Sequence, residues 1–154
     1  MQLEDIIKTR GFENDHHRAI VNLMQLNYEL KLRMKTELKL HGLTLEQFNI
    51  LRILNGQYGH PLSITEIQNR MIERSSNCSR IVDRLETKSL VYRKKDSTDK
   101  RNIAVCITAS GMLKIDQASK AMRRMEGELL KLNAADVNML NVILDKARNV
   151  LYKN

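Results

Sequence analysis

Residues 61–111 read PLSITEIQNRMIERSSNCSRIVDRLETKSLVYRKKDSTDKRNIAVCITASG, and this stretch decides the fold. It predicts a short capped helix, then a basic second helix within SSNCSRIVDRLETKS. The segments LVYRKK and IAVCIT are typical of strands, and the polar segment DSTDKRN joins them. Two short helices followed by a basic hairpin predict a winged helix-turn-helix. This arrangement sets a basic helix beside a basic loop, the pair of probes that a reader of duplex DNA needs.

Capping patterns predict where the helices of this region begin. Thr44 and Gln47 form one capping box, Thr-x-x-Gln, and Ser63 and Glu66 form another, Ser-x-x-Glu. The basic helix is expected to begin near Ser75, because serine is a favourable N-cap. The apolar positions expected to face the core are Phe48, Leu51, Leu54, Ile64, Ile67, Met71, Cys78, Ile81, Val82 and Leu85.

The second strand, from Asn102 to Thr108, alternates apolar and other residues. Ile103, Val105 and Ile107 are expected on one face, and Ala104 and Cys106 on the other. This pattern predicts that Cys106 is the more accessible of the two cysteines.

Long amphipathic helices are predicted on both sides of this region. One runs from about Asp15 to Leu40 and stops at Gly42, one follows Thr108 to about Lys131, and a last one follows Asn133. The first helix is apolar on more than one side, which favours a dimer partner over a central core helix of a monomer. We expect a mainly α single domain, residues 1–154, with a small β-hairpin wing.

The positive net charge of the chain indicates which classes of molecule it can bind. The chain has 154 residues and a formal net charge of +8, which favours polyanions such as DNA, RNA or an acidic membrane. It has no signal sequence and no apolar run long enough to span a membrane, and its two cysteines form no CxxC. These features predict a cytoplasmic protein with no membrane partner.

The positive charge is concentrated. Between Arg70 and Arg101 there are ten Lys or Arg and five Asp or Glu, so the net is 10 − 5 = +5. The start of the basic helix has small polar side chains, which allow close approach to a groove, followed by arginine. Asn77 is suited to adenine and Arg80 to guanine. The alternative is a surface helix whose serines merely cap its end.

The loop of the hairpin contains Asp99 and Arg101, two residues apart. The acid is expected to hold the guanidinium extended, so that Arg101 reaches a narrow minor groove. Nearby lysines are expected to contact phosphates. The predicted DNA-binding residues are Arg74, Ser75, Ser76, Asn77, Ser79, Arg80, Arg84, Lys94, Lys95, Asp99, Lys100 and Arg101. An ordinary charged hairpin tip is the alternative for the loop.

The sequence resembles the MarR family of bacterial transcription regulators in four features taken together. These are VDRLE at the end of the basic helix, the strand LVYR, the D-x-R of 99–101 and the IT before ASG. The resemblance covers about residues 43–111, which would form the DNA-binding lobe. It implies that residues 1–42 and 112–154 join an obligate homodimer. Such a dimer would read a palindromic operator with half-sites roughly 10 bp apart.

Two positions depart from the family pattern. Ser89 stands where the family usually has glycine, which puts the left-handed helix end and the angle of the wing in question. Ser97 and Thr98 replace the proline that commonly precedes D-x-R, which implies a softer wing. The resemblance also implies a repressor that loses DNA affinity when a small aromatic acid binds between the dimer helices and the lobe.

Three other functions are weighed. A redox-responsive regulator would use Cys106 or Cys78, although Cys78 is expected to pack in the core. A basic RNA-binding module lacks aromatic platforms, since only Tyr92 lies near the hairpin. The chain has no nucleophile–base pair, Gly-rich phosphate loop or H-E-x-x-H, and residues 13–17 are typical of a solvated helix start. We therefore expect no enzyme, no cofactor and no metal.

Overall fold

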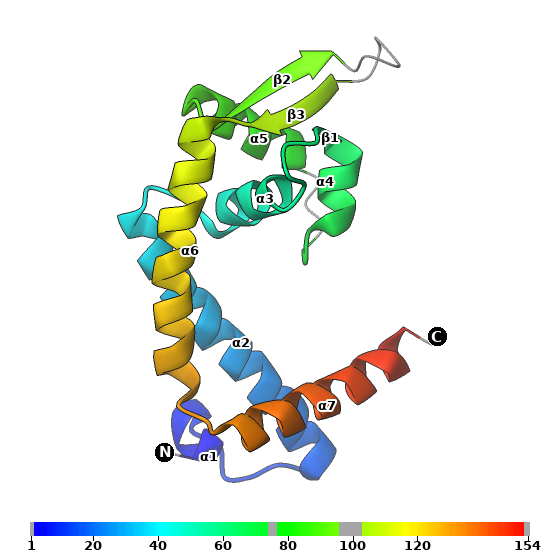
Figure 1. The fold of residues 1–154 in the computed structure, drawn as a ribbon. Coiled ribbons are helices and arrows are strands. Elements are labelled where there is room, and N and C mark those ends of the chain that lie inside the picture. Colours follow the sequence, from blue (N-terminus) through cyan, green and yellow to red (C-terminus); the bar gives the residue numbers. More distant parts are fainter. Residues whose placement is uncertain (1, 74–76, 96–102, 153–154) are drawn as a thin grey trace. The chain divides into compact units, whose positions relative to one another are not determined.

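Seven helices and three strands make up the part of the chain that this computed structural model describes, residues 2–73, 77–95 and 103–152 (Figure 1). They are α1 (Leu3–Ile7), α2 (Asp15–Leu40), α3 (Leu45–Asn55), β1 (Leu62–Ser63), α4 (Ile64–Arg70), α5 (Cys78–Thr87), β2 (Val91–Lys95), β3 (Ile103–Ile107), α6 (Ala109–Leu130) and α7 (Ala134–Leu151). The chain forms two compact units, residues 1–122 and 123–154. The mainly α class with a small hairpin is confirmed.

Helices α3 and α4 begin at the two predicted capping boxes. Thr44 Oγ1 accepts a hydrogen bond from the Gln47 amide at 3.2 Å, and Gln47 Oε1 accepts one from the Thr44 amide at 3.2 Å. Ser63 and Glu66 form the same reciprocal pair, at 3.2 and 2.8 Å. Each box satisfies two donors that a helix N-terminus leaves without partners.

A three-stranded antiparallel sheet lies above α3 and α4 in the lobe, in the order β1-β3-β2. The predicted hairpin is β2 and β3, with Tyr92 opposite Cys106 and Arg93 opposite Val105. The two-residue strand β1 was not predicted. Leu62 pairs with Val105, so the segment that enters α4 also closes one edge of the sheet.

The predicted alternation along β3 is wrong. Val105 is fully buried, but Ala104 and Cys106 are also buried, each with 5% of its surface exposed, whereas Ile103 is 51% exposed. β3 is the central strand, with a neighbour on each side, and α3 and α4 pack against it. The small Ala104 and Cys106 side chains are therefore covered even on the face that was expected to be accessible.

The core of the lobe is formed by the inner faces of α3, α4 and α5 together with the sheet. Its fully or almost fully buried side chains include Ile50, Leu51, Leu54, Ile67, Cys78, Val82, Leu85, Val91 and Val105. Cys78, Val82 and Leu85 follow three- and four-residue spacing, which is why α5 buries one side and exposes the other. Truncating a buried leucine in such a core to alanine typically costs about 2–5 kcal/mol of stability.

Ser89 ends α5 in the left-handed conformation, with φ +56°. The Ser89 amide donates to the Glu86 carbonyl at 2.8 Å, and the Leu90 amide donates to the Leu85 carbonyl at 3.0 Å. These two hydrogen bonds have the pattern of a Schellman motif, a helix C-terminus that usually has glycine at the left-handed position. The left-handed cap therefore forms with serine, and it turns the chain directly into β2.

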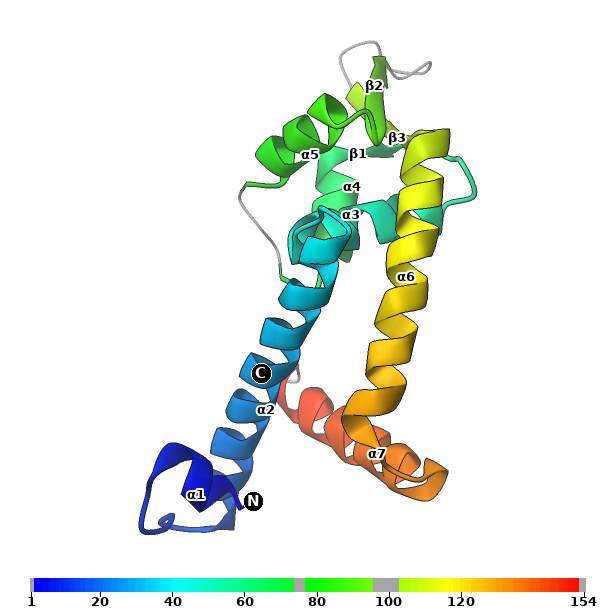
Figure 2. The ribbon, with the colours of Figure 1, turned by 90° about the vertical axis from the view of Figure 1, so that its left-hand side faces the viewer.

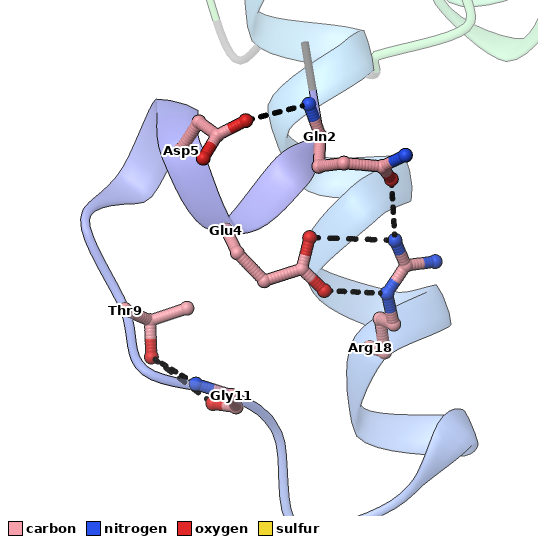
Figure 3. A network of polar contacts seen from close by, with 6 residues as sticks. All are labelled: Gln2, Glu4, Asp5, Thr9, Gly11 and Arg18. Atoms are coloured by element: carbon pink, nitrogen blue, oxygen red, sulfur yellow. Dashed lines mark hydrogen bonds and ion pairs between the residues drawn. The ribbon is translucent and has the colours of Figure 1, made fainter.

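The short helix α1 is held to the start of α2 by the side chain of Arg18 (Figure 3). Arg18 Nε donates to Glu4 Oε1 at 2.8 Å, and a second guanidinium nitrogen donates to Gln2 Oε1 at 3.5 Å. The hydrogen bond from Arg18 lowers the pKa of the Glu4 carboxyl. Leu3, which is 5% exposed, is the buried residue of α1.

Helices α2 and α7 expose much of their apolar surface. In α2 only Leu38 is buried, and in α7 no described residue is buried. The large exposed apolar side chains of these helices are Ile20, Leu23, Met24, Leu26, Tyr28, Leu32, Leu40, Met139, Val142, Ile143, Val150 and Leu151. An apolar surface of this extent on a long helix is typical of an interface with another chain.

Candidate nucleic-acid interface

Helix α5 begins later than predicted. Its first residue is Cys78, and Asn77 occupies the N-cap position with φ −93° and ψ 13°. The Asn77 carbonyl accepts the first helical hydrogen bond, from the Ile81 amide at 3.1 Å. The preference of serine for N-caps predicted Ser75, whereas the structure has Asn77 at this position, and residues 74–76 lie outside the described residues.

The outer face of α5 carries the exposed predicted residues Ser79, Arg80 and Arg84. Asp83 and Thr87 lie on the same face, and both are exposed. The residues at positions 80, 83, 84 and 87 follow three- and four-residue spacing, opposite the buried stripe. The face therefore presents two arginines next to one acid, on a helix whose other side is fixed in the core.

Cations neutralise the acids of the basic stretch where the structure describes them. Lys31 of α2 forms an ion pair with Glu73, and Arg93 of β2 forms ion pairs with Asp83 and Glu86. Arg80, Arg84 and Lys94 form no ion pair with any described residue. Pairing leaves the net charge of the stretch unchanged, but it takes up the described acids, so Arg80, Arg84 and Lys94 remain open to a polyanion.

The hairpin lies beside α5 in both views of the ribbon (Figure 1, Figure 2), and β2 contacts α5 directly. Lys94 is exposed on β2, and Lys95 is the last residue of that strand. The other predicted site residues lie outside the described residues: Arg74, Ser75 and Ser76 before α5, and Asp99, Lys100 and Arg101 between β2 and β3. The structure thus places Asn77, Ser79, Arg80 and Arg84 at the start and on the outer face of α5, which contacts the strand that carries Lys94 and Lys95.

Two cations of the basic stretch have structural bonds that the sequence did not predict. Lys88 Nζ donates to the Gly42 carbonyl at 2.6 Å and to Gln47 Oε1 at 3.1 Å, which ties the end of α5 to the start of α3. Arg93 has a side chain only 22% exposed. A signal for Arg93 exists, because residues two apart on a strand share a face and Val91 is buried.

Neither cysteine has the surroundings of a redox sensor. Cys78 is 1% exposed and Cys106 is 5% exposed, so Cys106 is the more exposed of the two, but it is buried as well. Burial raises the pKa of the Cys78 thiol, which lowers its thiolate fraction. Reactive cysteines are typically accessible and have a lowered pKa. The positions of both thiols therefore disfavour the redox-responsive alternative.

Comparison with known families identifies the lobe. The family model for MarR matches residues 43–103, which include α3, β1, α4, α5 and β2. Residues 43–103 are therefore similar to the MarR family. The matched segment agrees with the predicted lobe at its first residue, Leu43, and ends within β3. A comparison with curated proteins found no match.

Solved structures of MarR-type regulators share this fold. A MarR-like transcription regulator from Bacillus cereus has a TM-score of 0.79 at 17% identity, covering 89% of this chain and 98% of its own. The organohalide-sensing regulator RdhR, bound to 2,4-dichlorophenol, has a TM-score of 0.78 at 22% identity, covering 91% and 86%. S. aureus MepR in complex with DNA has a TM-score of 0.74 at 24% identity, covering 83% and 94%. The Bacillus cereus protein and RdhR are described as transcription regulators.

Two further observations concern other kinds of site. No three His, Cys, Asp or Glu side chains gather as a potential metal site in residues 2–73, 77–95 and 103–152. Within the same ranges, none of the helices combines the length and apolar character that crossing a membrane requires.

Proposed function

We propose that this chain is a transcription regulator that binds duplex DNA sequence-specifically as a homodimer and acts as a ligand-responsive repressor. The observation that carries the proposal is the outer face of α5, where Arg80 and Arg84 are exposed and form no ion pair with described residues. This face lies within the segment that matches the MarR family model, and the similar MepR structure is a complex with DNA. A rigid helix with exposed arginines suits the major groove.

Each predicted residue has a role in this proposal. Asn77, Ser79, Arg80 and Arg84 would read or approach bases in the major groove, with Arg74, Ser75 and Ser76 at the same end of the helix. Lys94, Lys95 and Lys100 would neutralise phosphates, which gives affinity that depends on salt but not on sequence. Asp99 would orient Arg101 into the flanking minor groove.

The homodimer part of the proposal is supported by the exposed apolar residues of α2 and α7. Met139, Ile143 and Val150 of α7 are each more than half exposed, and they share one side of the helix by spacing. Two copies related by a two-fold axis would read a palindrome with half-sites roughly 10 bp apart. In this arrangement the flanking helices of 1–42 and 112–154 belong with the lobe in one dimerising domain.

The proposed signal is a small aromatic acid. Support for its aromatic character comes from RdhR, a regulator of the same fold that was solved with the phenol 2,4-dichlorophenol. A ligand of this class would lower DNA affinity by binding the DNA-incompetent state of the dimer more tightly than the competent one.

The proposed function is tested by competition on one labelled duplex from the promoter of the protein's own gene. Unlabelled duplex of that sequence is expected to displace the label at much lower concentration than scrambled duplex or single-stranded RNA. Equal displacement by all three would reduce the protein to a non-specific polyanion binder. Preferential displacement by RNA would favour an RNA-binding module instead.

Arg80→Ala is expected to relax discrimination at one base pair in each half-site, by about 1–3 kcal/mol, because a bidentate guanine contact is lost. Fluorescence anisotropy on duplexes with single base-pair changes measures this loss. Arg52→Ala is the matched control, since Arg52 is exposed on α3 and bonds to Asn49. If Arg80→Ala keeps the base preference of the wild type, the assigned role is wrong.

Arg101→Ala is expected to weaken binding most where the flanks of the site are rich in A·T pairs, whose narrow minor groove attracts arginine. The measurement compares A·T-flanked and G·C-flanked duplexes that share one central sequence. The same Arg52→Ala control accounts for the loss of one positive charge. A uniform loss over both flanks would argue for a phosphate contact in place of minor-groove reading.

A further inference from the structure

Arg93 joins the hairpin to α5 through both its backbone amide and its guanidinium group. Its backbone amide donates to Glu86 Oε1 at 3.0 Å, and Nη1 donates to Glu86 Oε2 at 2.5 Å. Nη2 donates to Asp83 Oδ1 at 2.5 Å and to the Ser79 carbonyl at 3.5 Å. One residue of β2 therefore bonds to three positions spread over two turns of α5.

The Arg93 side chain is largely covered, and its guanidinium group fixes the geometry of the contact between β2 and α5. The Arg93 side chain is 22% exposed, while those of Asp83 and Glu86 are 56% and 39% exposed. Burial acts to lower the pKa of Arg93, but its hydrogen bonds with Asp83 and Glu86 raise it overall. The planar guanidinium fixes angles as well as distances when it bonds two carboxylates, which a lysine ammonium does not do.

We propose that Arg93 is a positioning residue, which sets the angle between α5 and the β2–β3 hairpin so that both engage one duplex. The proposal rests on the proposed function, and it assigns Arg93 no contact with DNA. The four bonds of Arg93 cross from β2 to the outer half of α5, whereas Val91 anchors the same strand in the core. The ion pair with Arg93 also neutralises the Asp83 carboxylate. This pairing reduces the repulsion of DNA phosphates that an unpaired carboxylate beside Arg80 would cause.

The test uses a duplex that the wild-type protein selects from a random-sequence library, and the same duplex shortened to remove the flanks. The ratio of the two affinities measures the share of binding that the hairpin contributes. Partial unfolding of a variant lowers both affinities by one factor and leaves the ratio unchanged. The ratio therefore separates positioning from a loss of stability.

Arg93→Gln is expected to lower this ratio roughly tenfold, the effect of losing one charge-assisted contact. Arg93→Lys keeps the charge and is expected to behave like Arg93→Gln, because it cannot bond both carboxylates in a fixed plane. Arg52→Gln is the control for charge, and it is expected to leave the ratio at the wild-type value.

The double variant Asp83→Asn, Glu86→Gln distinguishes a positioning role of Arg93 from a role of its charge alone, because the two roles predict opposite changes in DNA affinity. If Arg93 acted only through its charge, removing two acids beside the DNA would tighten binding to both duplexes. Under the proposal the ratio falls as it does in Arg93→Gln. A ratio that stays at the wild-type value in all three variants would overturn the positioning role, as would a wild-type ratio of one. Failure of the wild type to select any sequence would instead refute the proposed function itself.

Discussion

Ile143→Glu is expected to convert the protein to a monomer and to lower its affinity for duplex DNA about 100-fold or more. Ile143 is 54% exposed on α7, on the same side as Met139 and Val150. In a two-fold dimer the substitution places a carboxylate in the apolar interface twice, and each unpaired buried charge costs several kcal/mol. Loss of the dimer also removes the gain of about 10²–10⁴ that two linked binding modules provide.

Sedimentation velocity and anisotropy on the same samples measure both effects of Ile143→Glu. Asn141→Glu is the matched control, because Asn141 lies on the polar side of α7 with Asp145. The control is expected to remain dimeric and to bind as the wild type does. If Ile143→Glu stays dimeric, this side of α7 is not the interface. If it is monomeric but binds normally, a single copy is sufficient to read DNA.

Gly111→Ala is expected to lower the free energy of unfolding by about 2–3 kcal/mol or more, as overpacking in a rigid site does. A Cβ at this position would lie 2.1 Å from the Leu90 carbonyl oxygen and 2.7 Å from Ile107 Cγ1. The Leu90 carbonyl cannot easily retreat, because it accepts a hydrogen bond from the Thr108 amide at 3.1 Å. The start of α6 is thus packed against the turn that links α5 to β2.

Urea denaturation at equal protein concentration measures the effect of Gly111→Ala. Gly127→Ala, in the same helix, is the control, since a Cβ there meets nothing within 4 Å. The control is expected to be stabilised by about 0.5–1 kcal/mol, because alanine is the better helix former. Equal stability changes in the two variants would mean that α6 does not pack closely against Leu90.

Local patterns in the sequence predicted the helices well, because the relevant interactions are local. The side chains of Thr44, Ser63 and Asn133 each accept a hydrogen bond from the backbone amide three residues later. Both partners therefore lie within a short sequence motif that can be recognised without the structure. The apolar spacing of α5 likewise predicted which side is buried. The bounds of α2 and the position of the hairpin followed from the same kind of pattern.

Features that depend on distant residues could not be predicted in this way. The short strand β1 forms because Leu62 pairs with Val105, forty-three residues later by 105 − 62. Cys106 is buried because β3 is central in the sheet, which the alternation of its own residues does not reveal. Arg93 is one of the ten cations counted between Arg70 and Arg101, and the sequence did not predict that pairing with Asp83 and Glu86 gives it a structural role.

Reading of duplex DNA by the outer face of α5 is tested most directly by selection from a random-sequence duplex library. If the outer face of α5 reads DNA, the wild type is expected to enrich one palindromic motif with half-sites roughly 10 bp apart. Arg80→Ala is expected to enrich the same motif with one base pair in each half-site left undefined. Failure of the wild type to enrich any motif, or an identical motif from both proteins, would contradict the account.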